Sequence, residues 1–165
     1  MPFKKIQIVS PANAITGGPE SLHNLCHLLR SMGFNAQMVY YPFASNHTVP
    51  APYVKYKVDV DTLDDSPEAL VIFPETLCMP ALKLRKARSV IWWLSVDGFY
   101  EIRDNNYKDT LRYIRRAIKG RRPLRGVSAL SGLTHLSKCR YDEDFLTSKG
   151  FPFMRLSGPI SHTYV

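Results

Sequence analysis

A strand that runs through a glycine pair into an amphipathic helix is the feature that most constrains this chain. The apolar stretch 6–9 ends at Pro11, which predicts a short strand followed by a loop. Gly17 and Gly18 precede Pro19, a residue that suits the first turn of a helix because its φ is fixed and it lacks an N–H group. Apolar residues then recur at three- and four-residue spacing up to a glycine stop signal. This order of elements forms the first half of a βαβ unit.

Short apolar runs and helical patterns continue to alternate along the rest of the chain. The runs predict strands at 35–41, 68–73, 88–94, 133–137 and 152–156. The helical patterns lie at 76–86, 107–119 and 141–149. The proline-rich segment 42–67 indicates a long surface excursion, with at most a short strand near 54–58. The alternation predicts an α/β fold with a doubly wound, mostly parallel sheet in a single domain.

Composition narrows the class of protein. A chain of 165 residues with 45% hydrophobic residues can bury the core of one domain. No apolar run approaches the roughly 18 residues of a membrane span, and the N-terminus lacks a sustained signal-peptide core, so we expect a cytoplasmic location. Cys26, Cys78 and Cys139 are odd in number and far apart, which favours reduced thiols.

Two carboxylates follow predicted central strands. Glu75 comes directly after the strand 68–73, and Asp97 lies in the polar loop after the strand 88–94. Ligands of open α/β sheets bind beyond the carboxyl ends of the strands, so we expect both carboxylates to point into a common cleft. Asp97 could act there as a base or hold a sugar hydroxyl group. An Asx-type turn is an equally good interpretation of Asp97 on local chemistry.

The glycine pair allows a ligand to approach the backbone closely. Gly17 and Gly18 precede free N–H groups at a helix N-terminus, although a plain strand-to-helix turn has the same pattern. Neither the dinucleotide-binding pattern G-x-G-x-x-G nor the P-loop pattern is present, which disfavours both classes. Glu20 in the first helical turn already complements the helix dipole, so it suits sugar hydroxyl groups better than phosphate.

A metal site is not expected. His23, Cys26 and His27 share one side of the predicted helix, but no fourth ligand accompanies them. We therefore interpret Cys26 as a core residue and the histidines as helix surface.

The formal charge of +8 is concentrated in one segment. Between residues 103 and 126 there are nine basic and two acidic residues, and the basic ones include Arg112, Arg115, Arg116, Lys119, Arg121, Arg122 and Arg125. Such a run is either a solvated helix face or a surface for an anionic membrane, an anionic acceptor or nucleic acid. Nucleic acid is disfavoured because no recognisable binding module accompanies the basic run.

Several stretches together resemble the N-terminal domain of GT-B glycosyltransferases. They are IQIVSP, TGGPESLHNLCHLLRSMG, VIFPE, VIWWLSVDGFY, and THLSKCRYDEDFLTSKGF ahead of RLSGPI, with GGPE and WWLSVD the most distinctive. The resemblance implies a Rossmann-like domain that holds the acceptor, opposite a second domain that binds a nucleotide-sugar donor. It implies that Gly17, Gly18 and Glu20 shape a donor-facing loop and that Asp97, with Glu75 second, contacts or deprotonates the acceptor. Transfer in such enzymes is typically independent of bound metal.

The resemblance also implies a partner for this domain. The sequence stops at Val165, where a donor-binding domain would be expected to begin. We therefore expect residues 1–165 to supply the acceptor-side half of sugar transfer to a cell-surface glycan or lipid-linked acceptor, completed by a second Rossmann-like domain or subunit. A location at the inner face of the membrane is compatible with this role. The alternatives are a nucleic-acid or membrane-surface module that uses Arg112 to Arg125, and a non-catalytic partner subunit.

Overall fold

The computed structural model of this protein describes residues 3–43, 47–99 and 127–157. Strands alternate with helices through these residues, as the sequence predicts. The strands are β1 (Lys5–Pro11), β2 (Ala36–Tyr41), β3 (Ala69–Pro74), β4 (Arg88–Trp93), β5 (Thr134–Ser137) and β6 (Phe153–Arg155). The helices are α1 (Gly17–Ser31), α2 (Cys78–Ala81) and α5 (Arg140–Ser148), with short 3-10 helices η1 (Ala51–Tyr56), η2 (Glu75–Leu77) and η3 (Val127–Leu130).

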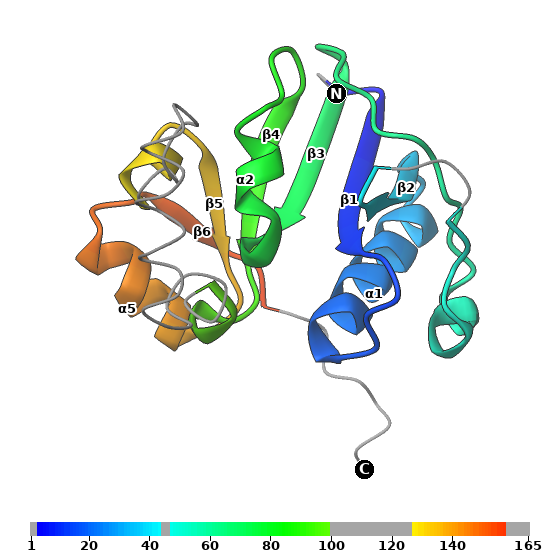
Figure 1. The fold of residues 1–165 in the computed structure, drawn as a ribbon, viewed down its shortest axis with the longest axis horizontal. Helices are drawn as coiled ribbons and strands as arrows, with labels where there is room; N and C mark the ends of the chain where they lie inside the picture. The colour runs from blue at the N-terminus through cyan, green and yellow to red at the C-terminus, as the bar shows by residue number, and fades with distance from the viewer. Residues whose placement is uncertain (1–2, 44–46, 100–126, 158–165) are drawn as a thin grey trace, which may run out of the picture.

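The six strands form one sheet in the order β2-β1-β3-β4-β5-β6 (Figure 1). Each pair of neighbouring strands is parallel, which confirms the predicted α/β, Rossmann-like class. From β1 the chain first moves outward to β2 and then returns to β3 on the other side of β1. The chain order therefore reverses between β1 and β3, and such a switch point is where open α/β sheets bind ligands.

Hydrophobic cores cover both faces of the sheet, as expected for parallel strands. One core contains Leu22 and Leu25 of α1 together with Tyr53 of η1. The other contains Ala81 of α2 and Leu146 of α5. The adjacent residues Trp92 and Trp93 are both fully buried, one in each core, because they point to opposite faces of the sheet.

The predicted helix 76–86 is wrong in extent. The chain forms η2 and α2 only as far as Ala81 and then turns toward β4. Pro80 lies in α2 and lacks the N–H group that a longer helix would use. The carboxylate of Asp65 accepts hydrogen bonds from the backbone N–H groups of Arg85, Lys86 and Ala87, which holds these residues in a loop.

The long connection between β2 and β3 also differs from expectation near 54–58. In place of a short strand, this segment forms the 3-10 helix η1. The helix is followed by Lys57, whose φ is +49°. Beyond it, Val60 forms an isolated parallel bridge with Met38 of β2. The predicted helix 107–119 and the basic residues Arg112 to Arg125 lie outside the described residues. Among the described helices, none is both long and apolar enough to cross a membrane.

Candidate functional site

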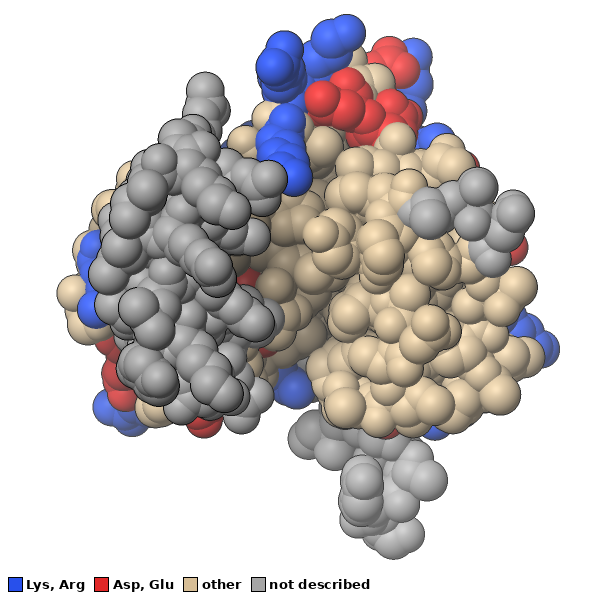
Figure 2. All heavy atoms as spheres, in the orientation of Figure 1, with Lys and Arg blue, Asp and Glu red and all other residues tan. Residues whose placement is uncertain are grey.

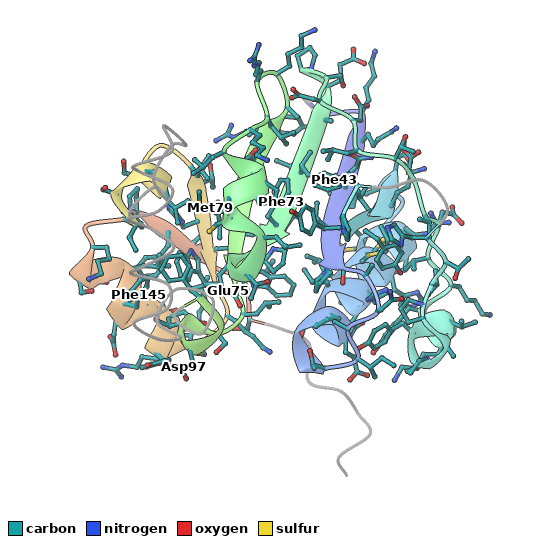
Figure 3. All side chains as sticks on the ribbon, viewed as in Figure 1. Phe43, Phe73, Glu75, Met79, Asp97 and Phe145 are labelled. Carbon is teal, nitrogen blue, oxygen red and sulfur yellow. The ribbon has the colours of Figure 1, made fainter. Side chains whose placement is uncertain are left out.

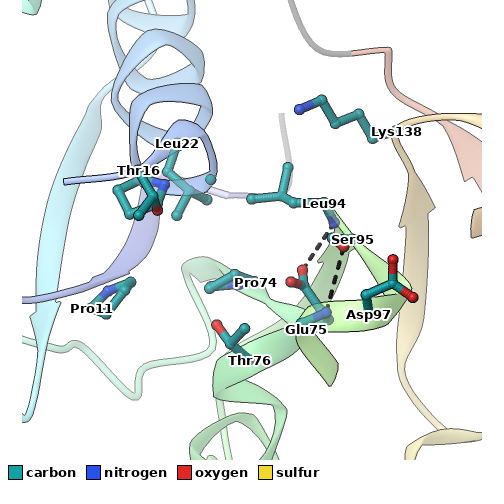
Figure 4. A pocket seen from close by; sticks show the side chains of 13 residues that line it. Pro11, Thr16, Leu22, Pro74, Glu75, Thr76, Leu94, Ser95, Asp97 and Lys138 are labelled. Carbon is teal, nitrogen blue, oxygen red and sulfur yellow. Dashed lines mark hydrogen bonds between the residues drawn. The ribbon is translucent and has the colours of Figure 1, made fainter. Parts of the chain in front are cut away.

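A pocket of about 320 Å³ lies over the carboxyl ends of β1, β3 and β4, at the switch point of the sheet. Figure 4 shows its walls, which come from the loop and first turns of α1, from η2, and from the segments after β4 and β5. The lining residues are Pro11, Thr16, Gly18, Pro19, Leu22, Pro74, Glu75, Thr76, Leu94, Ser95, Asp97, Gly98 and Lys138. The two carboxylates predicted to share a cleft, Glu75 and Asp97, thus line the same pocket.

Glu75 is the buried acid of this pocket. The apolar strand β3 ends at Pro74, so the next side chain lies at the edge of the sheet, where it is only 4% exposed. Its Oε2 accepts a hydrogen bond of 2.9 Å from the backbone N–H of Leu94. The pKa of the Glu75 carboxyl is raised to about 7, chiefly by burial and to a smaller extent by the nearby Asp142 carboxylate, while hydrogen bonds from backbone N–H groups such as that of Leu94 partly oppose the rise. The group therefore gains or loses a proton near neutral pH.

Gly98 shapes the pocket around this acid. A Cβ atom built on Gly98 would lie 3.0 Å from Glu75 Oε1 and 3.4 Å from Thr76 Cγ2. The backbone N–H of Gly98 donates to Ser95 Oγ at 3.5 Å (Figure 4). A Cβ atom at position 98 would crowd the Glu75 carboxyl, which would have to shift by a few tenths of an ångström, so glycine permits the close approach seen here.

Asp97 occupies the open side of the pocket. It lies in a helical turn, 96–99, that follows β4, and its side chain is exposed. Its Oδ1 accepts a hydrogen bond of 3.1 Å from the hydroxyl group of Tyr141 on α5. Figure 3 shows Glu75 and Asp97 on neighbouring segments at the same end of the sheet. The pocket therefore has one buried carboxyl and one solvated carboxylate.

The glycine pair contributes unequally. Gly18 lines the pocket, and a Cβ atom there would lie 3.8 Å from Leu94 Cδ1. Gly17 is not a lining residue. Glu20 is held on another side of α1, where its Oε1 accepts hydrogen bonds from Lys55 Nζ (2.9 Å) and the Tyr56 hydroxyl (3.0 Å). These donors lower the pKa of Glu20. The structure does not bring Glu20 together with Glu75.

Sequence reasoning missed the cation of the pocket, Lys138. It follows the last residue of β5 and lines the pocket, and its Nζ donates to Ser21 Oγ of α1 at 3.4 Å. Its position after a predicted strand was the signal available in the sequence. The hydroxyl groups of Thr76 and Ser95 also line the pocket, so donors and acceptors of both charge signs surround it.

The histidine and cysteine residues of α1 serve packing. His23 is fully buried, with Nδ1 2.6 Å from the carbonyl of Pro19 and Nε2 2.8 Å from the Tyr40 hydroxyl. His23 is therefore a core residue, and its predicted place on the helix surface is wrong. Cys26 is fully buried as predicted, and burial raises its pKa to about 12. No group of three or more metal-ligating side chains occurs in the described part of the chain.

Comparison of this chain with protein-family models, with curated proteins and with solved structures finds no match. The inference about the function of this chain therefore depends on the order of strands in its sheet and on the residues that line its pocket.

Proposed function

We propose that this chain supplies the acceptor-side domain of a glycosyltransferase and that its pocket holds the hydroxyl group that receives the sugar. The observation that carries the proposal is the Glu75 carboxyl, which is buried beside the switch point of a parallel sheet and has its pKa raised to about 7. A general base works best when its pKa lies near the working pH. The resemblance to GT-B glycosyltransferases gives the reaction class.

In the proposed reaction, Glu75 takes the proton of an acceptor hydroxyl group. The acceptor oxygen bonds to the anomeric carbon of the donor, the bond from that carbon to a diphosphate oxygen breaks, and the nucleoside diphosphate leaves. Glu75 then returns its proton to water. Asp97, which is exposed at the pocket mouth, binds a second hydroxyl group of the acceptor. The structural contrast between the two carboxyls favours Glu75 as the base and Asp97 as the binding group.

The rest of the lining suits a saccharide. Thr76 and Ser95 offer hydroxyl groups, while Pro11, Pro74 and Leu94 offer apolar surface. A sugar ring presents both hydroxyl groups and C–H faces, so it can satisfy a wall of this mixed kind. The nucleotide-sugar donor is assigned to a second Rossmann-like domain that faces the Gly18 side of the pocket, and the proposed chemistry requires no metal.

Binding to an array of immobilised saccharides tests this proposal. We expect the purified chain to bind a subset of the saccharides, and Glu75→Gln and Asp97→Asn each to weaken binding about tenfold or more, since each removes a charge-assisted hydrogen bond. Asp144→Asn removes an exposed carboxylate of α5 outside the pocket and serves as the control. Failure of the wild-type chain to bind any saccharide would refute the proposal.

Transfer activity provides a second test. We expect the 165-residue chain alone, mixed with nucleotide sugars and a bound saccharide, to show little transfer, because the proposal places the donor on another domain. Robust transfer by this chain would contradict the division of roles. Tight binding of RNA or duplex DNA with a steep salt dependence, abolished by charge reversal at Arg115 and Arg116, would instead favour a nucleic-acid-binding module.

A further inference from the structure

A second basic cluster lies at the end of the molecule opposite the pocket. Four basic residues occur within six positions where the chain passes from α2 into β4, and all four are exposed: Lys83, Arg85, Lys86 and Arg88. We call these four side chains the basic tip. Figure 2 shows Lys and Arg side chains gathered at the upper end of the molecule, where Figure 1 places the loop between α2 and β4.

Hydrogen bonds to the carboxylate of Asp65 fix the backbone of the basic tip. The Asp65 carboxylate accepts hydrogen bonds from the backbone N–H groups of Arg85 (3.0 and 3.1 Å), Lys86 (2.9 Å) and Ala87 (2.8 Å). These three N–H groups lower the pKa of Asp65. Because Asp65 bonds to the backbone, the side chains of the tip remain directed to solvent on an ordered loop.

The charge of the basic tip is not neutralised by side chains around it. The other carboxylates at this end of the sheet pair elsewhere: Glu68 with Lys4 at 2.6 Å, and Asp61 and Asp64 with Lys5 at 2.9 and 3.7 Å. Among the described residues, no ion pair involves any member of the tip. Arg88 donates one hydrogen bond, from Nη2 to Thr134 Oγ1. The four cations of the tip therefore face solvent, with Asp65 bonded to their backbone and with Asp61 and Asp64 sharing one lysine nearby.

We propose that the basic tip docks this protein on a membrane surface of anionic lipids. Basic residues close to such a surface gain energy from its negative potential. The four exposed cations occur within six positions of the chain, so they can approach such a surface together. Nucleic acid fits less well, because the segment 83–88 contains no aromatic residue for base stacking.

This docking has a consequence for access to the pocket. Strand β4 begins at Arg88 of the tip, and the pocket residues Leu94 and Ser95 follow its last residue. Six strand residues span about 20 Å. The pocket then opens away from the membrane, toward the aqueous side. Docking does not depend on the proposed sugar transfer, so each can fail without the other.

Sedimentation with lipid vesicles tests the docking. The full chain is mixed with vesicles of phosphatidylcholine alone and with vesicles that contain phosphatidylserine as well, each at low and at high salt. We expect binding to the phosphatidylserine vesicles only, with loss of binding at high salt. Each basic residue near such a surface contributes about fivefold to partitioning, so Arg85→Gln with Lys86→Gln should weaken binding about 25-fold.

The matched control is Arg140→Gln with Lys149→Gln, which removes the same charge from exposed positions on and after α5. We expect this control to bind as the wild-type chain does. If both double variants weakened vesicle binding equally, net charge alone would explain the loss, and the proposal would be overturned. The absence of wild-type binding would also overturn it, as would loss of binding on charge reversal at Arg115 and Arg116 with none in the tip variant. Circular dichroism and thermal unfolding confirm that the variants fold.

Discussion

Adding a single Cβ atom at Gly98 should alter the pocket around Glu75. In Gly98→Ala the new Cβ would lie 3.0 Å from Glu75 Oε1, closer than a relaxed contact, so the carboxyl or the turn must shift. Overpacking of this kind typically costs about 1–3 kcal/mol. We expect a lower free energy of unfolding in urea by about that amount, together with weaker saccharide binding.

Gly17→Ala is the matched control for that substitution. Nothing lies within 4 Å of a Cβ atom at Gly17, and Gly17 is the first residue of α1. Alanine is favoured over glycine in a helix, so stability should stay the same or rise by up to about 1 kcal/mol. Equal destabilisation in the two alanine variants would show that crowding at Glu75 is not the cause.

The sequence predicted some of the pocket residues. It missed those whose position depends on distant residues or on the order of the strands. Glu75 and Asp97 could be placed together because the carboxyl ends of parallel strands meet at one edge of the sheet. Glu20 was different, since its direction depends on Lys55 and Tyr56, which are more than thirty residues away in sequence. Lys138 lines the pocket because β5 lies next to β4 in the sheet. Hydrophobic periodicity does not predict this order of strands.

The 3-10 helix η1 holds the loop that forms one wall of the pocket. The Tyr53 hydroxyl accepts a hydrogen bond from the backbone N–H of Thr16 and donates one to its carbonyl, both at 3.0 Å. The ring of Tyr53 also stacks on His23, with ring centroids 4.3 Å apart. Because Thr16 makes no side-chain cap for α1, Tyr53 is the side chain that fixes the start of this helix.

Tyr53→Phe should therefore loosen the loop while it preserves the ring stacking. We expect a loss of about 1–2 kcal/mol in the free energy of unfolding, because the backbone of Thr16 loses its partner. Amide hydrogen exchange should rise in residues 13–18 more than in the strands. Lys55→Gln removes the exposed ion pair with Glu20 and the cation–π contact with the Tyr56 ring, and it should destabilise the protein less than Tyr53→Phe does. Unchanged exchange in 13–18 would contradict this function of Tyr53.

The elements that the sequence did not predict are those whose bounds depend on contacts between residues far apart in the sequence. Apolar periodicity was sufficient for β1, α1 and β3, whose bounds agree with expectation to within two residues. The short helix α2 was overextended because Asp65, twenty residues earlier, captures the backbone that would have continued it. Helix η1 was missed because its residues are fixed by contacts with α1 that leave no periodic signal in 42–67.

At the scale of the whole molecule, parallel pairing was predictable and strand order was not. Alternation of apolar strands with helices implies crossovers, and crossovers imply parallel neighbours. The reversal between β1 and β3 depends on which side of β1 the connection 42–68 returns to, and packing over the whole sheet decides this. The position of the pocket was therefore fixed only when the order β2-β1-β3 was known.

Buried ionisable groups on both faces of the sheet should make the stability of the protein depend on pH, with opposite signs for the histidines and for Glu75. Burial lowers the pKa values of His23 and His135 from 6.5, so the stability they contribute is complete above pH 6.5 and is lost as the pH falls below it. Glu75 has the opposite sign. Its pKa is raised from 4.5 to about 7, so stability is lost as the pH rises through that interval, by about 3 kcal/mol in total.

Urea unfolding between pH 5 and pH 8 separates these two contributions, because Asp61 and Asp65, whose pKa values are lowered, stay ionised there. In the wild-type chain the histidine contributions should rise up to about pH 6.5 while the Glu75 contribution declines up to about pH 7. Glu75→Gln cannot ionise, so its free energy of unfolding should rise more steeply than that of the wild type up to pH 6.5 and show no decline above it, whereas Asp97→Asn should keep the wild-type profile. A Glu75→Gln profile parallel to that of the wild type would mean that this carboxyl is not the buried acid of the fold, and the proposed base would lose its physical basis.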